Sequence, residues 1–459
     1  MPIPKCTKSG AFRHAGNLKD FRAYQSWENP RCEILKTIAK LKPMGKSLCL
    51  TCKGGRLLCG RSSCPLLQKL QIQNPIQGKL KETLFGPSPP SIFVGWKNYP
   101  NVFAGPMGTI SLRDEIISGS AGPTVKISDA QILDNPAQWY GLDFNDIIRM
   151  RSMLIRSKKE QGVREKTKLL EDMQELTLSV KATDVEMQFK GKPHYSVSFS
   201  PISQPMGPTA ILEKFRIAEN TKIPQAVDSI VSDRLKAVES SSLLYQKGFD
   251  VYYISKVLSA GILGLEKNKK LVPTRWSITT TDDILAKEMM KSIRIYPQVS
   301  DFLVYTNTYL ENHFEVLLIP GNWSFEQFEA WAPRTLWTLS QDKPTIAQES
   351  EGFSGRTKYA VTEGGGYYAG RFAVCEFLEK MRRQATTIVF REIYDSYVMP
   401  VGVWEIRENL RHAFQGKPLR FGTLGSALKH IESTLTIPIK EFISRSQFLR
   451  QKKLGDFLS

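Results

Sequence analysis

The segment YYAGRFAVCEFLEKMRRQATTIVFREI (Tyr367–Ile393) indicates the class of fold, because its pattern changes from helical to extended partway along. We expect a helix over 367–384 and a strand over 386–393, where β-branched and aromatic residues gather. Helices expected over 400–415 and 426–437 follow on its C-terminal side. Helix and strand therefore alternate here, and we predict a mixed α/β or α+β fold.

The same reading extends toward the N-terminus. We predict a buried strand over 313–320, one long helix over 227–248 that closes at Gly248, and one helix with a basic end over 143–161. A change from helical to alternating pattern is expected within 169–189. The predicted regions of the chain are an N-terminal region 1–90, a β-rich and helical segment 91–190, a mixed body 191–445 and a tail 446–459.

The charge of the chain points to a polyanionic partner. It contains 63 lysines and arginines against 45 acidic residues, for a formal net charge of +18 over 459 residues. Such an excess favours nucleic acid as a partner, with anionic lipid or a generally basic proteome as alternatives. No apolar run approaches the ~18–20 residues that span a bilayer, and the N-terminus has no apolar signal region. We therefore expect a soluble, cytoplasmic, nucleoid-associated protein without membrane contact.

Four of the seven cysteines lie within one short segment, CLTCKGGRLLCGRSSC, at Cys49, Cys52, Cys59 and Cys64. In an intracellular protein such clustering favours metal over disulfides, and four thiolates close a tetrahedral structural zinc site. The segment 49–64 is therefore predicted to be a zinc knuckle attached to the mixed body. An iron–sulfur cluster and plain buried thiols remain as alternatives.

Three polar segments could carry chemistry. The first, PTRWSITTTDDI, contains Arg275, Asp282 and Asp283, and we expect these residues to crowd a turn. The second, KYAVTEGGGYYAGRF, contains Glu363 and Arg371. The third, VFREIYDSYVMPVGVWEIRENL, contains Glu405 and Glu408. The carboxylates of the three segments could hold the divalent ions of a metal-dependent nuclease; they are Asp282, Asp283, Glu363, Glu405 and Glu408. Each carboxylate alone has an ordinary explanation, such as Asp282 as the N-cap of a helix that follows it.

A glycine run lies at the start of the expected helix of the second segment. Three glycines leading into a helix expose backbone amides, which are a natural seat for phosphate; the run consists of Gly364, Gly365 and Gly366. It matches neither the dinucleotide nor the P-loop pattern. A flexible turn into an amphipathic helix explains it equally well. Aromatic residues next to basic ones, as in RWSI, are suited to stacking on bases but also to burial in a core.

The cysteine cluster, PTRWSITTTDD, EGGGYYAGR, the LSAGILG segment and the tail occur together here, and this combination resembles the archaeal Nre family of DNA repair proteins, in particular its NreA type. The resemblance covers nearly the whole chain. It implies a role in the repair of DNA damage and a motif near the C-terminus that binds the sliding clamp PCNA. Carried over by position, the motif is Gln451, Leu454, Phe457 and Leu458. Leu458 stands where the strongest form of the motif has a second aromatic residue.

The tail supports this reading on physical grounds. Leu454, Phe457 and Leu458 share one face of a helical turn, which suits an apolar groove on a partner. The alternative is that this turn packs on its own domain. Three hypotheses follow for the whole chain: a repair factor tethered to the clamp that contacts DNA, a nuclease-like or nucleotide-processing enzyme, and a non-catalytic scaffold. Whether the chain is an enzyme stays open in the sequence.

Overall fold

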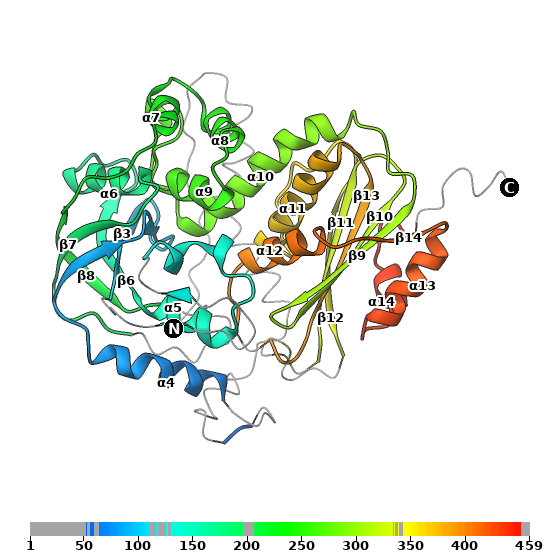
Figure 1. The fold of residues 1–459 in the computed structure, drawn as a ribbon, viewed down its shortest axis with the longest axis horizontal. Helices are drawn as coiled ribbons and strands as arrows, with labels where there is room; N and C mark the ends of the chain where they lie inside the picture. The colour runs from blue at the N-terminus through cyan, green and yellow to red at the C-terminus, as the bar shows by residue number, and fades with distance from the viewer. Residues whose placement is uncertain are drawn as a thin grey trace, which may run out of the picture.

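The described residues form two lobes, each built on a six-stranded mixed sheet (Figure 1). The structure is a computed structural model. It describes residues 64–110, 130–195, 206–333, 343–397 and 399–450, together with 52, 56–58, 116–117, 125–126, 335 and 338. The prediction of a mixed α/β body is confirmed by these two sheets.

The first lobe contains a sheet of order β1-β7-β8-β6-β3-β2. Its strands are β1 (Thr83–Ser88), β2 (Ile92–Val94), β3 (Asn101–Thr109), β6 (Leu154–Gly162), β7 (Thr183–Phe189) and β8 (Thr209–Ile217). Its helices are α4 (Pro65–Gln77), α5 (Phe144–Ser152) and α6 (Lys168–Leu178), and a separate ribbon consists of β4 (Ile116–Ile117) and β5 (Val125–Lys126). Strands β6 and β8 run parallel, and α6 lies in the crossover between them, as parallel neighbours require.

The second lobe contains a sheet of order β12-β11-β13-β10-β9-β14. Its strands are β9 (Phe302–Tyr309), β10 (Asn312–Ile319), β11 (Ser324–Trp331), β12 (Thr345–Glu351), β13 (Thr386–Ile393) and β14 (Leu419–Phe421). Helices α10 (Thr274–Ile293), α11 (Gly365–Met381) and α12 (Trp404–Ala413) cover one face, while α13 (Leu424–Thr434) and α14 (Ile439–Ile443) cover the other (Figure 1). Strand β10 is buried along its whole length because both faces of the sheet are covered.

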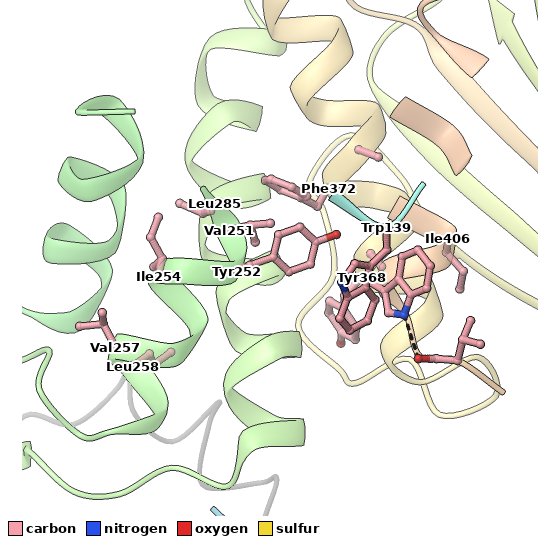
Figure 2. Close-up of a cluster of buried hydrophobic side chains, with 14 of the residues drawn as sticks. Trp139, Val251, Tyr252, Ile254, Val257, Leu258, Leu285, Tyr368, Phe372 and Ile406 are labelled. Atoms are coloured by element: carbon pink, nitrogen blue, oxygen red, sulfur yellow. Dashed lines mark hydrogen bonds between the residues drawn. The ribbon is translucent and has the colours of Figure 1, made fainter. Parts of the chain in front are cut away.

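A layer of helices joins the lobes, and their apolar core runs through it. Helices α8 (Ala237–Gln246) and α9 (Val251–Ser259) pack against α10, and α7 (Gln225–Ser232) packs against α8 (Figure 1). Figure 2 shows part of this core, with Tyr252 from α9, Leu285 from α10 and Phe372 from α11. Trp139 of the first lobe packs edge-on against Trp404 of the second, with ring centroids 5.2 Å apart. Burial of such large aromatic surfaces holds the lobes together.

Most of the expected elements are present, and two of them differ. The helix expected over 367–384 is α11, and the strands expected over 313–320 and 386–393 are β10 and β13. The change of pattern expected within 169–189 is confirmed by α6 and β7. The single helix expected over 143–161 was wrong, because the chain leaves α5 after Ser152 and continues as β6. Pairing of β6 with β3 and β8 outweighs the local helical pattern.

The single helix expected over 227–248 was also wrong. It is two helices, α7 and α8, and the second begins where the Glu239 carboxylate accepts a hydrogen bond from the Lys236 amide at 2.8 Å. The region boundary expected after residue 190 falls between β7 and β8, which pair with each other in the first sheet. Among the described helices, none combines the length and apolar character needed to cross a bilayer.

Candidate nucleic-acid interface

A large cleft lies between the two lobes, with a volume of about 2110 Å³. Its walls come from β2 and the loop after it, from α5 and β6, from α9 and the first turns of α10, and from the loops before α11 and α12. Of the described residues that line it, eight are basic and two, Asp134 and Glu165, are acidic. The basic residues are Arg151, Arg156, Arg164, Lys256, Lys270, Arg275, Lys358 and Arg407. The cleft is therefore a positively charged cavity suited to an anionic ligand.

Aromatic rings in the loop after β2 lie beside basic side chains. The Arg275 guanidinium lies 5.5 Å from the Trp96 ring centroid, and the Lys270 ammonium lies 5.6 Å from that of Tyr99. Lys270 also donates a hydrogen bond to the Tyr99 hydroxyl at 2.9 Å. Trp276 packs against Tyr99 with ring centroids 5.3 Å apart. Planar rings and cations are thus interleaved along one wall.

The first turn of α10 holds this wall in place. The Thr274 hydroxyl accepts a hydrogen bond from the Val94 amide of β2 at 2.9 Å and so ties the helix to the first lobe. Arg275 and Trp276 follow directly, which places both at the cleft. The sequence indicated this segment as a chemical site, and the structure puts its N-terminal half in the cleft wall. The turn expected there was wrong, because residues 274–293 form one continuous helix.

The inner wall of the cleft contains more positive than negative charge. Lys256 and Arg151 share a single carboxylate, Asp134, at distances of 3.2 and 3.4 Å. Arg156 has no acidic partner among the described residues, and its buried Nε has no hydrogen-bond partner there either. Burial, together with the neighbouring Arg151, lowers the pKa of Arg156 to about 10. The guanidinium stays charged at neutral pH, and an anion beside it would offset the cost of its burial.

The two predicted aspartates lie beneath the cleft, inside the helical layer. Both oxygens of Asp282 accept hydrogen bonds from Arg407 Nη2 at 2.7 Å, and Asp282 is completely buried. Asp283 is paired with Arg371 and with Lys287, whose Nζ is 2.8 Å away. Asp282 lies in the middle of α10, so its expected role as an N-cap was wrong. These carboxylates neutralise buried arginines.

The ionisation of the two aspartates differs with their partners. Burial raises the pKa of Asp282 above its usual value although Arg407 opposes the shift. Burial also acts on Asp283, but Arg371 and Lys287 outweigh it, and the pKa of Asp283 lies below its usual value. Arg371 also links Asp283 to strand β12, because its Nη1 donates a hydrogen bond to Glu351 at 2.8 Å. The segments 275–283 and 363–371 are therefore in direct contact.

Glu363 and the glycine run form the start of α11. The Glu363 carboxylate accepts a hydrogen bond from Gln327 Nε2 at 2.8 Å. Burial and the nearby Glu329 and Glu349 raise the pKa of Glu363 well above its usual value. Such a carboxyl favours its protonated, neutral form, which is a poor ligand for a divalent cation. Among the described residues, no group of three or more histidine, cysteine or acidic side chains is arranged to hold a metal ion.

The three glycines serve the packing of α11. The Gly364 amide donates to the Ala360 carbonyl at 2.9 Å, and the Gly366 amide donates to the Glu363 carbonyl at 3.2 Å. Gly365 lines the cleft. A Cβ atom on Gly366 would lie 2.4 Å from Glu329 Oε1, so glycine is required for the close approach of α11 to the sheet.

Most of the predicted zinc ligands and clamp-binding residues are not among the described residues or are not in the cleft. Cys49 and Cys59 lie outside the described residues, as do Gln451, Leu454, Phe457 and Leu458. Of the remaining predicted ligands, Cys52 is buried, and Cys64 directly precedes α4. The Cys64 carbonyl accepts hydrogen bonds from the amides of Leu67 and Gln68, each at 3.1 Å.

Sequence reasoning missed most of the residues that line the cleft. Phe93, Trp96 and Tyr99 were assigned only to the β-rich and helical segment 91–190, and Arg156 was placed on a helix. The available signal was their spacing, because the three aromatic residues recur every third position, with Lys97 between them. The partners Arg156, Lys270 and Arg275 are distant in sequence, and only the fold brings them to these rings.

The fold and the cleft define a two-lobed α/β protein with a basic, aromatic-lined cavity between its lobes. The family model described as "Archaeal Nre, N-terminal" matches residues 58–338, and the model described as "Archaeal Nre, C-terminal" matches residues 351–457. The chain therefore belongs to the archaeal Nre family.

Relatives support this assignment over most of the chain. It is 38% identical to the DNA repair protein NreA of Archaeoglobus fulgidus, over 89% of this chain and 98% of the relative. It is 36% identical to the DNA repair protein NreB of the same organism, over 89% of this chain and all of the relative. It is 33% identical to the DNA repair protein NreA of Haloferax volcanii, over 82% of this chain and 88% of the relative. No solved structure matches the chain.

Proposed function

We propose that this chain acts in DNA repair and that it contacts DNA in the cleft between its lobes. The observation that carries the proposal is the lining of this cleft, with eight basic and two acidic residues. Relatives that cover nearly the same length are named DNA repair proteins. The formal net charge of +18 adds a long-range attraction for a polyanion. Such a protein would work in the cytoplasm, at the nucleoid.

The contacts around the predicted carboxylates favour a binding role over a metal-dependent nuclease. Asp282 and Asp283 are each engaged by an arginine, Arg407 and Arg371, and both lie inside the protein. A pair of catalytic metal ions needs carboxylate oxygens that face the substrate. Arg275, in contrast, is exposed at the cleft. The proposal therefore assigns Arg275 to DNA contact and the two aspartates to the stability of the helical layer.

Removal of cleft charges tests the proposal. Binding of fluorescein-labelled DNA, both single-stranded and duplex, is measured by fluorescence anisotropy at fixed salt. The double variant Arg156→Ala/Arg275→Ala should bind at least about tenfold more weakly, because each phosphate contact contributes to affinity. Lys417→Ala removes an exposed positive charge outside the cleft and should bind like the unmodified protein. Absence of binding to either form of DNA would contradict the proposal.

We further propose that residues 451–459 recruit the protein to the sliding clamp PCNA. The support is the sequence pattern of Gln451, Leu454, Phe457 and Leu458, which suits an apolar groove. Leu454→Ala/Phe457→Ala should abolish retention of the clamp in a pull-down, whereas Lys452→Ala/Lys453→Ala should preserve it. Equal retention by both variants would refute this assignment.

We also propose a structural zinc site at the four cysteines. Cys52 is buried and Cys64 is anchored by hydrogen bonds at the start of α4, so a metal there would tie the N-terminal segment to the first lobe. Metal analysis of the purified protein should find about one zinc per chain. Cys52→Ser/Cys64→Ser should lose this zinc, while Cys375→Ser, at a buried cysteine of α11, should retain it. Iron in place of zinc would point to the cluster alternative.

A further inference from the structure

Three aromatic residues at the edge of the first lobe share one feature. Phe93, Trp96 and Tyr99 are spaced three residues apart, and each has a cation beside its ring. The Arg156 guanidinium lies 5.0 Å from the Phe93 centroid, Arg275 lies over Trp96, and Lys270 lies beyond the edge of the Tyr99 ring, where it donates to the hydroxyl. The cations come from three separate parts of the chain: β6, the first turn of α10 and the loop before α10. All six residues line the cleft.

These cations retain their capacity for an anion. Among the described residues, Arg156, Lys270 and Arg275 have no carboxylate partner, although buried arginines elsewhere in this protein each have at least one. Arg156 and Arg275 lie over ring faces, which leave the N–H donors in the plane of each guanidinium available. The Lys270 ammonium uses one of its donors on the Tyr99 hydroxyl and keeps the others. Phe93, Trp96, Tyr99 and their three cations therefore form a row, in which rings alternate with charges that have no carboxylate partner among the described residues.

The dimensions favour an extended ligand. A cavity that binds one small molecule has a volume of about 300–1,000 Å³, whereas this cleft has about 2110 Å³. A single nucleotide would fill only part of it. A nucleic-acid strand repeats a base and a phosphate, and the row repeats a ring and a cation. The two repeats therefore match.

Resting on the proposed contact with DNA, we propose that this row, together with Trp276, is a binding track for an unpaired DNA strand. The strand's bases stack on the rings of Phe93, Trp96, Tyr99 and Trp276, and its phosphates pair with Arg156, Lys270 and Arg275. In a duplex the base faces are already stacked on each other, so they are not accessible to these rings. The track therefore selects single-stranded over double-stranded DNA.

Ring removal tests this selectivity. Anisotropy titrations compare a labelled oligothymidylate strand with a labelled duplex of the same length. Trp96→Ala should weaken strand binding roughly tenfold, as loss of a stacking ring does, and should change duplex binding much less. Trp96→Phe keeps a ring and should restore most of the affinity. Phe85→Ala removes a 65% exposed ring on β1, outside the cleft, and should have no effect on either ligand.

Tryptophan fluorescence provides a second measurement that needs no alanine variant. Addition of oligothymidylate should quench the emission of the intact protein, and Trp96→Phe/Trp276→Phe should lose most of that quenching while it still binds. A melting curve for each variant identifies loss of folding. If the proposed DNA contact is wrong, neither strand nor duplex binds. If only the track is wrong, DNA still binds, but Trp96→Ala leaves strand and duplex binding unchanged or weakens both by the same factor.

Discussion

Arg371 lies completely buried between two carboxylates, Asp283 and Glu351. Replacement by alanine leaves the fully buried Glu351 without this partner and leaves Asp283 with Lys287. We expect Arg371→Ala to lower the free energy of unfolding by about 3–5 kcal/mol, because removal of one partner of a buried ion pair leaves the other charge buried and uncompensated. Urea denaturation measures this loss.

The exposed ion pair of Arg216 with Glu186 is the matched comparison. Water screens this pair, so Arg216→Ala should lower the free energy of unfolding far less than Arg371→Ala does. Equal losses of unfolding free energy in the two variants would show that burial does not increase the contribution of the Arg371 ion pairs to stability.

Glu405 gives the stability of the protein a dependence on pH. Burial raises the pKa of this carboxyl to about 7, although Arg391 opposes the shift. The unfolded chain releases this proton near pH ~4.3, so between roughly pH 4.3 and 7 the folded state holds one more proton at this site. The contribution to the unfolding free energy is therefore largest below this window and falls as pH rises, by up to about 1.4 kcal/mol per pH unit.

Glu405→Gln removes this titrating proton and should flatten the fall of stability across the window, as measured by urea denaturation at several pH values. The fall is reduced rather than abolished, because burial also raises the pKa values of Glu329 and Glu363. Glu213→Gln, at an exposed position on β8, should keep the original pH profile. An unchanged profile in Glu405→Gln would contradict the assignment.

At the scale of an element, α11 depends on its glycines for its distance from the sheet. A Cβ atom on Gly370 would lie 1.9 Å from Gln327 Oε1, and Gln327 is held in place by its hydrogen bond to Glu363. Gly370→Ala should therefore destabilise the protein by about 1–3 kcal/mol in thermal or urea denaturation. Gly425→Ala in α13 meets nothing within 4 Å and should instead stabilise by up to about 1 kcal/mol.

The elements also show how far local pattern predicts structure. Helix α11 and strand β13 were predictable because each has its own clear pattern and is buried accordingly. Strand β6 was not, because Arg156 and its charged neighbours give LIRSKKEQ the look of a basic helix end. Of these charged residues, Arg156 lines the cleft. A residue placed for a site and not for its strand misleads a local reading. The cleft itself joins Trp96, Arg156 and Arg275, which lie far apart in sequence.

At the scale of the whole molecule, the positive cleft predicts how DNA binding responds to salt. The logarithm of the binding constant should fall linearly with the logarithm of salt concentration, because each phosphate contact releases counterions. For a single strand, Arg275→Ala should reduce this slope by about 0.7, the share of one contact. Anisotropy titrations over a range of salt measure it, and Lys417→Ala should keep the slope of the unmodified protein.

The two matched halves of the family do not correspond to the two lobes. The N-terminal model ends at residue 338 and includes β9, β10 and β11, whereas the C-terminal model starts at residue 351 and includes β13 and β14. These strands form one sheet, in which β11 and β10 both pair with β13. Neither half contains a complete second lobe, so we expect both halves to be required for a stable fold.

The packing of Trp139 against Trp404 has a consequence for biosynthesis. The ribosome synthesises Trp139 before Trp404. During translation the Trp139 indole therefore lacks this partner until a further 265 residues have been added. The cleft acquires its inner wall only when almost the entire chain has been made. A product truncated before Trp404 would leave the Trp139 indole without this partner.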